Sequence, residues 1–185
     1  DFAPALAQGR KLLTYGKPVY LNEFGSKKYW SNGINGALWH SAVLPQAWAA
    51  GINPVQFPMS EWPVMHVDYD KLGLFSDWNK GWAIKPAYWV YVNFYTLFGG
   101  AEVLKVATPV GSMAAAARRR QPDVLSVWLT NMASAERKST VFRIDNWPTG
   151  VAVVTVYDNL AGPDPRDVFR LQVTDGKLVF SYALA

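Results

Sequence analysis

Over much of the first hundred residues, hydrophobic and polar residues follow a helical or strand-like period, and loops separate these stretches. Apolar positions spaced for one face of a helix give way to short apolar runs bounded by turn residues. The pattern predicts helices over residues 2–15, 33–50 and 85–98, and strands over 18–24 and 52–59. In chain order, helices and strands therefore alternate, which is typical of a parallel α/β unit.

Proline and glycine mark the limits of these elements. Gly16 and Gly51 stand where the first two helices are expected to stop. Pro86 suits the first turn of the third helix. Pro45 falls within the second helix, and we expect it to interrupt that helix because proline has no N–H to donate.

The third helix, residues 85–98, is apolar nearly all round, so it should be buried on more than one side. We expect its aromatic stripe to be core and to join the helix to the part of the chain that follows. The stripe consists of Trp89, Tyr91, Phe94, Tyr95 and Phe98.

After Gly100 the period changes to that of strands, and turn residues separate the runs. The predicted strands are 102–106, 113–119, 124–131, 139–144, 151–157, 168–173 and 178–182. Short antiparallel strands at this spacing favour a small β-sandwich. We place the boundary near residue 100, which divides the chain into residues 1–100 and 101–185. Trp128 and Trp147 are the tryptophans of this part that could form an exposed aromatic surface for binding a ligand. Trp128 lies between two apolar residues and is expected to be core, so such a surface is not evident.

Composition excludes several classes of function. Half of the 185 residues are apolar and 15% are aromatic, which indicates a globular core. The net charge of +4 is mild, and the run 118–120 of three arginines lacks interleaved aromatic residues, so nucleic-acid binding is not predicted. The chain has no cysteine, and its two histidines, His40 and His66, lack metal-ligand spacing, so no metal or cofactor is predicted. No apolar run is long enough for a transmembrane helix, and no signal peptide pattern is present.

The first strand ends on a carboxylate, Glu23, directly before Phe24-Gly25. The two-residue period of a strand predicts that Glu23 shares the face of Val19 and Leu21. A carboxylate at a strand tip is costly in a core and useful in a cleft. Two interpretations stay open from the residues alone, a structural ion pair with a Lys or Arg and a catalytic group.

Four segments together resemble the C-terminal end of a (β/α)8-barrel glycoside hydrolase of clan A, and family 39, the β-xylosidase type, is the nearest in pattern. Residues 17–25 (KPVYLNEFG) are similar to the seventh barrel strand, and residues 51–57 (GINPVQF) to the eighth. Residues 72–78 and 85–88 resemble the loop and final helix of the barrel, and the remainder resembles the β-sandwich that follows it. The resemblance implies an α/β plus all-β chain: the last two strands and three helices of a TIM barrel, then the sandwich.

The resemblance also implies site residues and partners. Glu23 corresponds to the nucleophile of a retaining enzyme, and Trp62 to an aromatic platform for the sugar. Trp30, Glu61 and His66 are candidates for further substrate contacts. The acid/base residue belongs to a strand that this chain does not supply, so a missing N-terminal barrel segment or another chain is the expected partner, with a carbohydrate as substrate. Enzymes of the kind that the chain resembles often act outside the cytoplasm, as secreted or periplasmic proteins.

Two alternatives to a hydrolase fragment stay open. One is a non-catalytic carbohydrate-binding module in which the barrel part is only a scaffold. The other is a structural half-barrel that assembles with copies of itself or with another chain, since its strand edges and apolar helix favour a partner.

Overall fold

The computed structural model describes residues 2–22, 24, 33–55, 73–76, 78–99, 103–104, 106, 113–121, 124–132, 137–157 and 164–184. Its helices are α1 (Ala3–Leu13), α2 (Ile34–Ala49) and α3 (Pro86–Phe98), with a short 3-10 turn at Trp78–Lys80. The strands are β1 (Val19–Leu21), β2 (Ile52–Pro54), β3 (Val103–Leu104), β4 (Met113–Gln121), β5 (Val124–Asn131), β6 (Arg137–Asp145), β7 (Gly150–Tyr157), β8 (Pro165–Val173) and β9 (Lys177–Leu184). The order of helices and strands therefore confirms the one predicted from the sequence.

The N-terminal part holds a two-stranded parallel sheet, β1–β2, in which Val19 pairs with Ile52 and Leu21 with Pro54. One face of this sheet packs against α1 and the end of α2, where Ile52 meets Leu6 and Ala47. Alternation puts Tyr20 and Asn53, which pair with each other, on the opposite and exposed face. Among the described residues, the helices that cover the sheet lie on the side of Val19, Leu21 and Ile52.

Helix α2 runs without a break through Pro45, so the expected interruption is wrong. Pro45 cannot donate to the carbonyl of Ser41, four residues earlier. That carbonyl instead accepts a hydrogen bond of 2.9 Å from Nε1 of Trp128 on β5. Beside it, the hydroxyl groups of Ser41 and Thr130 lie 2.6 Å apart in a buried hydrogen bond. A distant strand thus satisfies the group that the proline leaves free.

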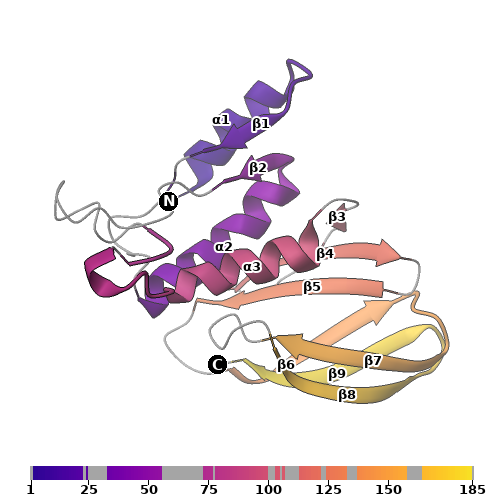
Figure 1. Ribbon diagram of the computed structural model, residues 1–185. Helices are drawn as coiled ribbons and strands as arrows, with labels where there is room; N and C mark the ends of the chain where they lie inside the picture. Colours follow the sequence, from indigo (N-terminus) through magenta and orange to yellow (C-terminus); the bar gives the residue numbers. More distant parts are fainter. Residues whose placement is uncertain are drawn as a thin grey trace.

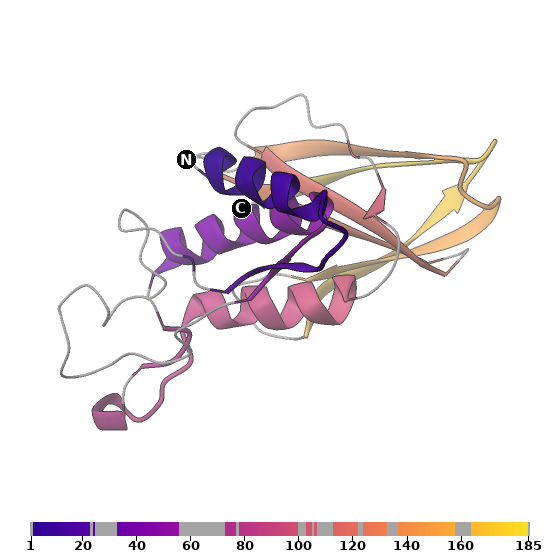
Figure 2. The same ribbon diagram turned by 90° about the horizontal axis from the view of Figure 1, so that it is seen from above.

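The largest core cluster lies between α2, α3 and β5, and α2 and α3 lie side by side in both views (Figures 1 and 2). Phe94 and Phe98 of α3 stack on each other, and both rings meet Trp128 edge-on, at 5.3 and 5.8 Å between centroids. Trp128 is buried, as predicted. Tyr95 is not core, contrary to the expectation, because 45% of it is exposed and its hydroxyl reaches the backbone of β2.

The remaining strands pair antiparallel, as the turn spacing predicts. They form a three-stranded sheet, β3-β4-β5, and two strand pairs, β6-β9 and β7-β8. Helix α2 packs on β4 and β5, and the two strand pairs lie beyond β5, away from α1 (Figure 1). Ala152, Val173 and Leu178 form a further buried cluster between these pairs. The observed architecture is a mixture of helices and small sheets.

Candidate functional site

The five residues predicted as site residues, Glu23, Trp30, Glu61, Trp62 and His66, all lie outside the described residues. Their roles and their mutual geometry therefore stay predictions. The described residues do define what surrounds the end of β1 and the edge of β2.

Phe24, the residue directly after Glu23, lies in a cluster of aromatic rings. Its ring centroid is 6.4 Å from that of Phe2, 6.1 Å from Trp39 and 5.7 Å from His40. These separations lie within the range of favourable aromatic pairs. The N-terminal end of α1 and the first half of α2 thus contact Phe24, three residues beyond β1.

His40 links this cluster to α3. Its Nδ1 lies 3.0 Å from the hydroxyl of Tyr91, in a buried hydrogen bond, and its ring packs edge-on against Trp39 at 4.9 Å. Burial lowers the pKa of His40 to about 4, so the imidazole is neutral near pH 7. Burial, and then the neighbouring Tyr95, raise the pKa of Tyr91 well above its ordinary value, so the phenol also stays neutral. The pair is an uncharged hydrogen-bonded link between two helices.

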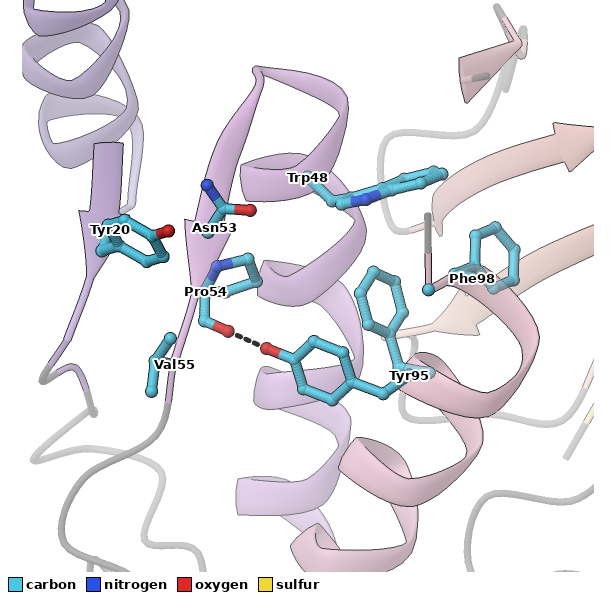
Figure 3. Close-up of a pocket in the computed structure, with 9 residues that line it drawn as sticks. Tyr20, Trp48, Asn53, Pro54, Val55, Tyr95 and Phe98 are labelled. Carbon is cyan, nitrogen blue, oxygen red and sulfur yellow. Dashed lines mark hydrogen bonds between the residues drawn. The ribbon is translucent and has the colours of Figure 1, made fainter. Parts of the chain in front are cut away.

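A pocket of about 280 Å³ opens between β2 and α3 (Figure 3). Tyr20 and Asn53 line it from the sheet, and Trp48 and Tyr95 from the helices. The amide nitrogen of Asn53 donates to the carbonyl of Val19, and the Tyr95 hydroxyl donates to the carbonyl of Pro54. The pocket therefore has aromatic walls. The amide of Asn53 and the phenols of Tyr20 and Tyr95 add polar groups beside the edge of β2.

Sequence reasoning found neither the pocket nor the cluster around His40. His40 and Tyr91 are far apart in the chain, and no local pattern connects them. Tyr20 and Asn53 could have been found, because a paired register of two short strands places them on the face away from the apolar residues.

The described part of the chain contains no group of three or more His, Cys, Asp or Glu side chains arranged to hold a metal ion. Among its helices, none is both long and apolar enough to cross a membrane.

The comparisons with known proteins connect this fold to a glycoside hydrolase. No protein-family model matches the sequence, and no curated protein is similar to it in sequence. Among solved structures, the chain is similar to the GH30 endoxylanase from Clostridium papyrosolvens C71, with a TM-score of 0.59 and 16% sequence identity over 93% of this chain. The match covers 41% of the endoxylanase, so the chain spans less than half of its length. At this identity the likeness shows the fold.

Proposed function

We propose that the chain is part of a retaining glycoside hydrolase that cleaves β-glycosidic bonds in plant or microbial polysaccharides or oligosaccharides. The observation that carries the proposal is the similarity in fold to the endoxylanase over nearly the whole chain. The sequence of residues 17–25, in which a predicted strand comes before Glu23, also supports the proposal. In the structure, β1 forms within this segment, at Val19–Leu21.

In this proposal Glu23 is the nucleophile. Its carboxylate attacks the anomeric carbon, the bond to the leaving oxygen breaks, and water later releases the sugar from the glycosyl-enzyme. Trp62 stacks on the sugar, and Trp30, Glu61 and His66 contact its remaining parts. The acid/base, which a retaining enzyme holds about 5–5.5 Å from the nucleophile, comes from outside this chain.

The same proposal assigns residues 1–100 to the last two strands and three helices of a (β/α)8 barrel and residues 101–185 to an accessory β-sandwich. The sheet supports this, because two parallel strands covered on one side cannot form a stable sheet alone. The pocket beside β2 is the place where a neighbouring strand would pack, and there the Tyr95 hydroxyl caps the Pro54 carbonyl. A missing barrel segment or another chain is therefore the proposed partner, and a purely structural role in such an assembly is the second candidate.

Within the class of glycoside hydrolases, the sequence motifs resemble family 39, whereas the similar structure is named a GH30 endoxylanase. Both names refer to enzymes that act on xylose-containing substrates, so β-xylosides are the first substrates to test.

The test uses aryl β-glycosides with leaving groups of different pKa, assayed with the chain and with Glu23→Gln. A 2,4-dinitrophenolate leaves without protonation, so its release does not need the missing acid/base. We expect slow release of dinitrophenolate by the chain, almost none from substrates with poor leaving groups, and none by Glu23→Gln.

Equal release by the chain and by Glu23→Gln would refute the role of Glu23. No release by either protein would leave the second candidate, which predicts a stable assembly in sedimentation without any hydrolysis.

A further inference from the structure

Phe24, three residues beyond the end of β1, contacts rings from two helices. Phe2 comes from the start of α1, and Trp39 and His40 come from α2. Because Phe24 sits between three rings rather than against one, small movements of its backbone would separate several contacts at once. The cluster therefore restrains the backbone of the residue that follows Glu23.

The cluster is itself anchored in the core. His40 is 1% exposed and Tyr91 is 6% exposed, and their hydrogen bond ties the cluster to α3. The rings of His40 and Tyr91 also pack at 5.4 Å. Phe24 is thus held through His40 by the same helix that contacts Trp128 of β5.

We propose that Phe24 is a positioning residue for Glu23, held in place by the rings of Phe2, Trp39 and His40. This inference rests on the proposed function, in which Glu23 is the nucleophile. Covalent attack requires the carboxylate to lie within a few tenths of an ångström of a productive position. A strand end carries that precision only if the adjacent backbone is fixed, and Phe24 is the described residue closest to Glu23 on its C-terminal side.

The test observes the Glu23 carboxyl directly by carbon-13 NMR of the intact chain labelled at the glutamate side-chain carboxyl. The sequence has four glutamates, Glu23, Glu61, Glu102 and Glu136, and Glu23→Gln identifies the signal of Glu23 by its disappearance. The variants are Phe24→Leu, Phe24→Tyr as the conservative replacement, and Trp39→Leu, which removes a second ring of the cluster.

Phe75→Leu is the matched control. Phe75 is a half-buried phenylalanine like Phe24, packs against the same core cluster, and contacts the ring of Tyr88 in a tilted pair with centroids 4.9 Å apart. It makes no ring contact with Phe2, Trp39 or His40 among the described residues.

In the unmodified chain we expect the Glu23 signal to differ from its value in urea. Phe24→Leu and Trp39→Leu should shift it toward that value, while Phe24→Tyr and Phe75→Leu leave it in place. The proposal is overturned if the unmodified signal already has the urea value, if Phe24→Leu leaves it unmoved, or if Phe75→Leu moves it equally. The glycoside assay with Glu23→Gln reports separately on the proposed function, so a shifted signal without hydrolysis would refute only the role of Glu23 as nucleophile.

Discussion

The carbonyl that Pro45 leaves free in α2 gives a sharp prediction about stability. Nε1 of Trp128 donates to that carbonyl, on Ser41, and Trp128 is 3% exposed. Trp128→Phe keeps an aromatic ring against Phe94 and Phe98 but removes the donor. A buried carbonyl without a partner costs roughly 1–3 kcal/mol, so we expect the free energy of unfolding to fall by about that amount.

A second substitution separates the lost hydrogen bond from the lost volume. Pro45→Ala restores an N–H that can donate to the Ser41 carbonyl within the helix. In the Pro45→Ala background, Trp128→Phe should therefore cost about 1 kcal/mol less than in the unmodified chain. Urea unfolding followed by far-ultraviolet circular dichroism gives all four free energies. Equal costs of Trp128→Phe in the two backgrounds would refute the coupling between Pro45 and Trp128.

Two further predictions concern His40 and Gly51. Because burial lowers the pKa of His40 to about 4, the unfolded chain binds the proton first as the pH falls. Stability should therefore be lost between about pH 6.5 and pH 4, by about 3 kcal/mol, and urea titrations of His40→Gln should show a smaller loss over that window. Gly51 has φ of +77°, and an added Cβ would lie 3.3 Å from Cδ1 of Leu13. Gly51→Ala should cost about 1–2 kcal/mol in thermal unfolding, and an unchanged melting temperature would contradict the strain argument.

Local patterns in the sequence were sufficient to predict the type and order of the elements. Helix α3 (Pro86–Phe98) matches the predicted 85–98 to within one residue, and β5 spans Val124–Asn131, as predicted. Short-range signals decide such features, because turn residues and period act over a few positions. The division of the chain at residue 100, the sandwich and the barrel remain predictions.

The errors have tertiary causes. Pro45 was expected to interrupt a helix, but a tryptophan far along the chain supplies the missing hydrogen bond. Tyr95 was expected in the core, but its hydroxyl binds the backbone of Pro54 at the edge of β2. Neither partner could be inferred from neighbouring residues.

The candidate site could be predicted only by resemblance, and the expected face of Glu23 is still a prediction. The face that Val19 and Leu21 share is the one packed against α1, whereas Tyr20 and Asn53 occupy the exposed face. A period of two would put Glu23 with Val19 and Leu21, but β1 ends at Leu21, so the strand period does not fix the side of Glu23.

The most direct test of the central claim is to trap the glycosyl-enzyme. A 2,4-dinitrophenyl 2-deoxy-2-fluoro-β-xyloside forms the covalent intermediate without an acid and slows its hydrolysis. We predict that mass spectrometry of the digested chain finds one added sugar on the peptide that contains Glu23, and none in Glu23→Gln. Absence of the adduct, or an adduct that persists in Glu23→Gln, would contradict the assignment of Glu23 as the nucleophile.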